Sequence, residues 1–170
     1  LPDSLPAALY GGLVFEPDGR AITYVHRSRV DGPRLKRHVL GTAVSGDSVL
    51  FGAGYGPTAF LNVSSVDGGK QRLITVGHGW ARNEVLLQDV RSGTTRDITR
   101  GIDAHFSPQF VEKELWMRTD YEAPRGRVVK VDLNDPAWCH GPRCNWEKTN
   151  ALINRFASDG MIGMNSVSVG

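Results

Sequence analysis

A hairpin signal that recurs at a regular distance constrains the fold of this chain more than any other feature of its sequence. Runs rich in Val, Ile, Thr, Tyr and Phe, which are typical of strands, flank Pro17-Asp18-Gly19 and again Asp67-Gly68-Gly69. Proline fixes its own φ, aspartate supports a turn through its side chain, and glycine accepts positive φ, so both segments predict tight hairpins. A third pair of runs flanks Val111-Glu112-Lys113, where the turn chemistry is less typical.

Each hairpin is followed by two further strand-like runs, and the turns at Asp18, Asp67 and Glu112 lie 49 and 45 residues apart. The predicted strands are 13–16, 21–26, 35–40, 48–51, 60–64, 72–76, 84–89, 95–99, 105–110, 114–119, 127–133 and 151–156. Four strands per unit of about 45 residues is the period of a β-propeller blade. We therefore predict an all-β fold, a partial β-propeller with about three four-stranded antiparallel blades at 10–52, 58–101 and 103–156 and the start of a fourth at 161–170.

A blade of this kind is apolar on both faces and buries them only against neighbouring blades, in a ring. We know of no closed ring of three blades, so we expect the chain to be a fragment of a larger propeller domain. The sequence stops in mid-strand at Gly170, which favours an end set by cloning or degradation. The exposed blade faces predict self-association.

Composition excludes several classes of partner. The net charge is +2 with 22% charged residues, which indicates an ordinary protein surface rather than a nucleic-acid-binding one. The basic cluster Arg34, Lys36, Arg37 and His38 is interpreted as one solvated face of a strand. No apolar run is long enough to cross a membrane, and 1–15 make a poor signal peptide, so we expect a cytoplasmic protein.

No catalytic group is recognisable. The chain contains no G-x-S-x-G nucleophile motif and no glycine-rich phosphate loop that opens a helix, so we predict no catalytic residue and no cofactor. His105 is interpreted as a hydrogen-bonding residue at a blade edge, and His26 and His38 as structural or solvated. Trp116 is predicted to be in the core. The glycine-rich segment 52–57 is interpreted as a connection between blades.

The segment from Cys139 to Cys144 contains two cysteines and His140, which is too few ligands for a typical zinc site. Three interpretations stay open, in decreasing order of preference: free thiols in a loop insertion, a local disulfide, and a metal site. We predict no metal.

Trp80 lies in the loop between the second and third strands of the middle unit, with Arg82 close by. A tryptophan beside an arginine on such a loop offers a stacking and cation–π surface to a ligand. A tryptophan that fills the space between blades is an equally good interpretation. We take His78, Trp80 and Arg82 as the residues that face a ligand.

Several phrases, taken together, resemble the propeller domain of the prolyl oligopeptidase family of serine peptidases. They are "PDGRAITYVH", "RLKRHVLGT", "DGGKQRLITV" followed by "RNEVLLQDV", "LWMRTDYEAPRGRVVKVDL" and "ALINRFASDGMIGMNSVSV". The resemblance covers roughly 10–170, and it rests on the order and spacing of these phrases.

The resemblance implies a seven-bladed propeller that covers the active site of an α/β-hydrolase domain and filters substrates by size. The family cleaves short peptides after proline with a Ser-Asp-His triad in the hydrolase domain. Nothing in this chain matches that triad, so the catalytic domain is absent from it and we predict that the chain alone is inactive. The implied partners are the hydrolase domain and short peptides.

One loop departs from the family pattern. Where well-known members carry an Arg-Glu-Gly-Cys stretch that faces the cavity, this chain has Gly77, His78, Gly79 and Trp80, and only the glycine matches. The arginine and cysteine with which the family contacts its substrate are therefore not carried over to this chain. Two alternatives remain: a stand-alone propeller scaffold for protein–protein interaction, and a related peptidase such as an oligopeptidase B or a dipeptidyl peptidase.

Overall fold

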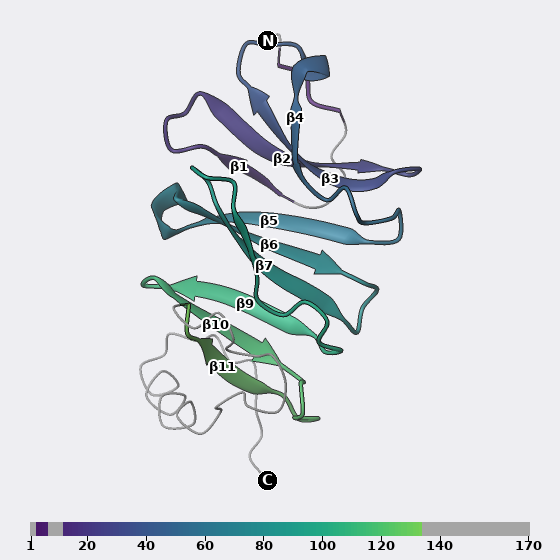
Figure 1. Cartoon of the computed structure of the whole chain (residues 1–170), viewed down its shortest axis with the longest axis vertical. Helices are drawn as coiled ribbons and strands as arrows, with labels where there is room; N and C mark the ends of the chain where they lie inside the picture. The colour runs from purple at the N-terminus through teal and green to yellow at the C-terminus, as the bar shows by residue number, and fades with distance from the viewer. Residues whose placement is uncertain (1–2, 7–11, 134–170) are drawn as a thin grey trace.

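The computed structural model describes residues 3–6 and 12–133 of the chain, which form strands joined by short loops (Figure 1). The strands are β1 (Leu13–Phe15), β2 (Ala21–Ser28), β3 (Gly32–Val39), β4 (Ser48–Phe51), β5 (Phe60–Val66), β6 (Gln71–Gly77), β7 (Asn83–Asp89), β8 (Thr95–Asp97), β9 (Phe106–Val111), β10 (Glu114–Thr119) and β11 (Arg127–Val131). Two single-turn 3-10 helices, η1 (Val44–Gly46) and η2 (Asp67–Gly69), lie in connections.

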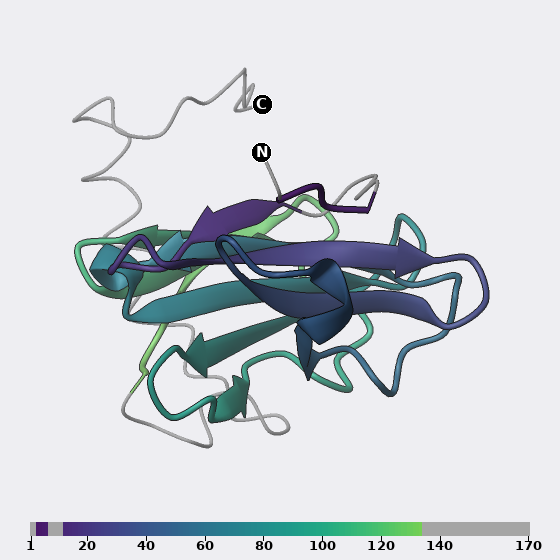
Figure 2. The ribbon, with the colours of Figure 1, turned by 90° about the horizontal axis from the view of Figure 1, so that it is seen from above.

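The strands form three antiparallel sheets in which sequence neighbours pair. The strand orders are β1-β2-β3-β4, β5-β6-β7-β8 and, within the described residues, β9-β10-β11. The sheets follow one another in chain order (Figure 1) and lie over one another when viewed along the stacking direction (Figure 2). This arrangement confirms the all-β fold and the partial β-propeller.

The middle sheet is buried on both faces, as the period-2 alternation of a strand requires. Ile74 and Leu86 point to the first sheet and join a core with Val25 and Leu35. Leu73 on the other face joins the core shared with the third sheet. The apolar runs in β6 and β7 therefore have a direct physical cause, because each successive side chain meets a different neighbouring sheet.

The first two hairpin turns pack against each other. Gly69, at φ 88°, approaches Pro17 so closely that a Cβ on Gly69 would lie 2.6 Å from the Cγ of Pro17. A side chain at this position would therefore collide with the neighbouring turn. Gly69 is therefore needed both for the backbone angle of its own turn and for the close contact between the two sheets.

Polar side chains also join the sheets. Asn83, at the start of β7, donates a hydrogen bond to the carbonyl of Phe106 and accepts one from its N–H, both at 2.7 Å. Glu16 lies 2.8 Å from Arg37 of its own sheet and 2.9 Å from the buried Arg72 of the next. These contacts satisfy groups that packing would otherwise bury without partners.

The basic cluster on β3 is not one solvated face, so that prediction was wrong. Arg37 lies on the opposite face of the strand from its neighbours and pairs with Glu16 through two hydrogen bonds of 2.8 Å. Arg34 donates to the carbonyls of Pro33, Gly52 and Tyr55. His38 is fully buried. The cause is that loops and segments beside the first sheet supply acceptors to Arg34, Arg37 and His38.

Most predicted strand ends are shifted by one to three residues, and β8 shows why. The predicted strand 95–99 ends at Asp97, because the chain then turns toward β7, where the N–H of Val85 donates to the hydroxyl of Thr99 at 2.8 Å.

The predicted strand 151–156, the predicted fourth blade and Cys139, His140 and Cys144 lie outside the described residues. The division into blades at 10–52, 58–101 and 103–156 remains a prediction. Within the described part of the chain, no helix has the length and apolar character needed to span a membrane.

Candidate ligand-binding face

Several connections emerge at the same end of the three sheets, because alternate loops of an antiparallel meander share an end. They are the β6–β7 loop at 78–82, the connections between sheets at 52–59 and 98–105, and the β10–β11 loop at 120–126. We call this end the loop face. It carries all three residues that the sequence predicts to face a ligand.

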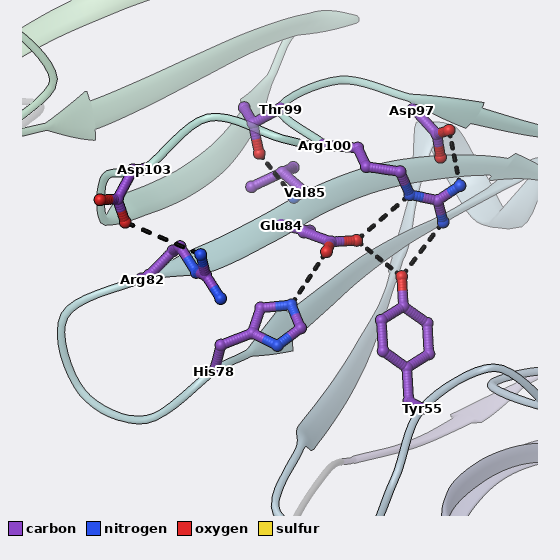
Figure 3. A network of polar contacts seen from close by, with 9 residues as sticks. All are labelled: Tyr55, His78, Arg82, Glu84, Val85, Asp97, Thr99, Arg100 and Asp103. Atoms are coloured by element: carbon purple, nitrogen blue, oxygen red, sulfur yellow. Dashed lines mark hydrogen bonds and ion pairs between the residues drawn. The ribbon is translucent and has the colours of Figure 1, made fainter.

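Glu84, the second residue of β7, is the centre of a polar network on this face (Figure 3). Its carboxylate accepts hydrogen bonds from the Tyr55 phenol at 2.6 Å and from the Nε of Arg100 at 3.3 Å. Its other oxygen lies 2.9 Å from the Nε2 of His78. Arg100 also donates to the Tyr55 hydroxyl at 3.1 Å and pairs with Asp97 at 2.9 Å.

The network joins four segments of the chain. Tyr55 comes from the connection between the first two sheets, His78 from the β6–β7 loop, and Arg100 from the connection to the third sheet. Because one carboxylate contacts all three, it fixes the β6–β7 loop relative to both neighbouring sheets.

The network shifts the ionisation of its members. Burial and the hydrogen bond to Glu84 raise the pKa of Tyr55 to about 12. Burial alone would raise the pKa of Glu84, but the hydrogen bonds from Tyr55, His78 and Arg100 outweigh it and hold that pKa below its usual value. Glu84 is therefore ionised and Tyr55 protonated at neutral pH.

Trp80 stands at the tip of the β6–β7 loop with 97% of its surface exposed. Together with Phe60, Leu61, Arg82 and the backbone of Gly77 and Gly79, it lines a hollow of about 540 Å³, which we call the first hollow. Arg82 is turned toward Asp103 (Figure 3), at 3.9 Å. Both partners are largely exposed, so this pair holds Arg82 only weakly.

The structure separates His78 from Trp80 and Arg82, the other two residues predicted to face a ligand. Trp80 and Arg82 border the first hollow, whereas the imidazole of His78 points to Glu84. His78 therefore acts within the described chain as a contact that orders the loop. Trp80 does not fill space between sheets, because almost none of its surface is covered.

A second hollow, of about 380 Å³, lies on the other side of Trp80, toward the third sheet. It is lined by Trp80, His105, Arg118, Asp120, Arg125 and Gly126, among others. The main-chain N–H of His105 donates to the carboxylate of Asp120 at 2.8 Å. This bond comes from the backbone of His105, directly before β9, and the role of its side chain at a blade edge stays a prediction.

Two further predictions from the sequence are confirmed. Trp116 is 8% exposed and belongs to the buried residues, as predicted. The segment 52–57 is the connection between the first two sheets, also as predicted. Among the described residues, no group of three or more His, Cys, Asp or Glu side chains is arranged to hold a metal ion.

Sequence reasoning missed Tyr55, Glu84, Arg100 and Asn83 as members of the face. Tyr55 and Glu84 are 29 positions apart in the chain, and no local pattern joins them. A signal was present in Glu84 and Asn83, since polar residues directly before the apolar run of a buried strand point to specific partners.

Comparison with known proteins identifies the family. Residues 1–148 match the model of the prolyl oligopeptidase N-terminal β-propeller domain. The chain belongs to this propeller family. The curated prolyl endopeptidase of Elizabethkingia meningoseptica is 24% identical over 108 residues, which is 62% of this chain and 15% of that enzyme.

Solved structures agree with the propeller assignment. A structure from a study of two prolyl endopeptidases superposes with a TM-score of 0.70 at 25% identity, over 85% of this chain and 22% of that one. Oligopeptidase B from Trypanosoma brucei has a TM-score of 0.63 at 19% identity, over 80% of this chain and 19% of that one, which shows a shared fold. The chain thus spans about a fifth of the length of these two solved structures and 15% of the length of the curated enzyme.

Proposed function

We propose that this chain is part of the propeller that covers the active site of a prolyl oligopeptidase-like serine peptidase and admits only short peptides. The observation that carries the proposal is the family match over 1–148. The chain supplies walls rather than reacting groups, since none of its motifs is catalytic. The nucleophile and its base would belong to an α/β-hydrolase domain, which is the proposed partner.

The packing of the sheets supports the proposed size filter. Two apolar cores hold three sheets face to face, and each core includes side chains of the middle sheet. Blades packed in this way around an axis leave a narrow channel, and opening it to a folded protein would expose the buried apolar surface. Short peptides enter without that cost and would be cleaved after proline.

We further propose that Trp80 and Arg82 face the peptide. An exposed indole offers a flat apolar surface to a peptide side chain, and the weakly held guanidinium of Arg82 can turn toward an acceptor. His78 contributes by holding the loop through Glu84.

The test is a peptidase assay on the longer protein that contains this chain. We expect it to cleave a fluorogenic peptide after proline and to leave the same sequence intact when it lies in a surface loop of a folded protein. Equal rates on both substrates would contradict the size filter. No cleavage of either substrate would contradict the peptidase itself and would favour a scaffold.

A further inference from the structure

We propose that the second hollow, between Trp80 and the β10–β11 loop, binds a carboxylate carried by a short peptide. The proposal has two parts: an anion site formed by Arg118 and Arg125, and an apolar wall formed by Trp80. That the ligand is a peptide rests on the proposed function. That it is a carboxylate follows from the charges of the hollow.

Two guanidinium groups line the hollow without a carboxylate of their own. Within the described residues, no ion pair joins Arg118 or Arg125 to an acidic side chain at 4.0 Å or less. Cationic side chains at such a site attract anions, and a guanidinium matches the geometry of a carboxylate with two parallel hydrogen bonds.

The side chain of Arg118 is exposed, and its guanidinium lies beside the β10–β11 loop. Its guanidinium lies against Gly126, where an added Cβ would come within 3.7 Å of the Nε. Gly126 has φ 78°, so the turn that carries it favours glycine.

The acidic side chains nearby do not neutralise the hollow. One oxygen of Asp120 already accepts the main-chain N–H of His105 at 2.8 Å. Glu122, in the same loop, lies 3.7 Å from Arg127 instead. The lining therefore carries two guanidinium groups against one carboxylate, and this excess favours an anionic ligand.

Trp80 and the volume of the hollow define the ligand further. The indole of Trp80 is 97% exposed and borders the second hollow directly. A volume of about 380 Å³ is at the small end of ligand sites and suits the last residues of a peptide. The expected ligand has an apolar side chain next to a carboxylate, which comes either from a free C-terminus or from an Asp or Glu side chain.

Direct binding to the full chain tests the proposal without any hydrolysis. Calorimetric titrations would use an acetylated tetrapeptide that contains proline and ends in leucine, made as the free acid and as the amide. A third, amidated peptide carries glutamate after the leucine, and a fourth carries glutamine there. The first pair tests a free C-terminus, and the second pair tests an acidic side chain.

We expect at least one acidic peptide to bind about three- to tenfold more tightly than its neutral partner, as two solvent-exposed charge pairs would give. The double variant R118Q/R125Q removes this preference, and W80A weakens both members of the pair. R91Q serves as the matched control, because Arg91 is an exposed arginine at the opposite end of the middle sheet. Circular dichroism of each variant confirms that the fold is retained.

Equal affinity for the acidic and neutral partners in both pairs, or no binding of any of the four peptides, would overturn the proposal. A preference that survives in R118Q/R125Q would also overturn the proposal, because the two arginines would then not be needed for it. A preference that R91Q loses as well would overturn it too, because the peptide would then respond to the overall charge of the chain. A carboxylate preference in a protein whose longer form does not cleave after proline would support the anion site and refute the peptidase. Cleavage after proline without the preference would do the reverse.

Discussion

The Glu84 carboxylate is the single group on which the geometry of the loop face depends most. It contacts Tyr55, His78 and Arg100, which come from three separate connections. Its side chain is only 16% exposed, so its charge is stabilised by these partners more than by water. A change at this position therefore affects both the stability of the sheets and the order of the Trp80 loop.

Replacing Glu84 by glutamine removes the charge and keeps the size. We expect E84Q to lower the free energy of unfolding by about 1–2 kcal/mol, because the hydrogen bonds from Tyr55 and Arg100 lose their charge assistance. Urea denaturation measures the change. Y55F and the double variant complete a cycle, in which we expect less than additive losses. Strict additivity would contradict a direct coupling between the two side chains.

His38 forms a second polar cluster, on the outward face of the first sheet. Its Nδ1 lies 2.7 Å from Asp47 and its Nε2 lies 3.2 Å from Asp3, while the Tyr24 hydroxyl donates to Asp47 at 2.7 Å. The hydrogen bond to Asp47, supported by the one to Asp3, outweighs burial and raises the pKa of His38. The contact with Asp3 holds the described N-terminal segment against β3, and it is strongest when the imidazole is protonated.

This cluster makes stability depend on pH. A raised pKa in the folded state gives a stabilisation that is complete below the unfolded value of about 6.5 and is lost as the pH rises through the folded value. We expect the melting temperature of the chain to fall as the pH rises above about 6.5, and to fall less in H38Q. H26Q, a change at a partly exposed histidine of β2, is the control. An identical pH profile for H38Q and the unmodified chain would refute the role of His38.

The two clusters show what sequence could predict about single residues. Trp116 was predictable as a core residue, because it lies between apolar neighbours in a strand. The burial of His38 was not, because its acceptors Asp47 and Asp3 are 9 and 35 positions away in the chain. A sequence pattern alone makes a charged residue look solvent-exposed, because its partner can lie far away in the chain. The ion pair of Arg37 with Glu16 is a second example.

At the scale of elements, the positions of the hairpin turns were predictable from the sequence, and the least typical of them proves to be strained. The hairpin between β9 and β10 has only Glu112 and Lys113 between the paired residues Val111 and Glu114. Both adopt positive φ, at 48° and 69°. Such a turn favours Asn-Gly, and a side chain in this region costs about 1–2 kcal/mol for an ordinary residue. The weak turn signal in the sequence thus corresponds to a strained turn in the structure.

Relieving this strain should stabilise the third sheet. We expect E112N/K113G to raise the free energy of unfolding by about 1 kcal/mol or more. Thermal or urea denaturation measures the gain. As a control, D18N, a change in the first hairpin beside Gly19, leaves a turn that already has suitable chemistry and should have little effect. Equal stability of E112N/K113G and the unmodified chain would show that the hairpin is not strained in solution.

At the scale of the whole molecule, the order of the sheets was predictable because each repeats the same hairpin and turn pattern. The contacts between sheets were not, since Asn83 with Phe106 and Tyr55 with Glu84 depend on how sheets stack. The outward face of the first sheet leaves Leu13, Phe15 and Val49 exposed, by 47%, 64% and 52%. In a complete ring, such a face would lie against a neighbouring blade.

The uncovered face predicts self-association of the isolated chain. We expect light scattering to show a mass that increases with concentration toward a dimer, driven by burial of this apolar surface. Replacing Phe15 and Val49 by serine should shift the equilibrium toward the monomer, whereas serine at Val30, an exposed apolar residue in the β2–β3 turn, should not. A clean monomer at high concentration of the unmodified chain would contradict the prediction.

A propeller segment of this kind would wall off chemistry that a neighbouring domain performs. The most direct measurement compares the chain with the longer protein that contains it, on one fluorogenic peptide with proline before the scissile bond. We predict hydrolysis by the longer protein and none by the chain at equal concentration. Hydrolysis by the purified chain alone would contradict the account.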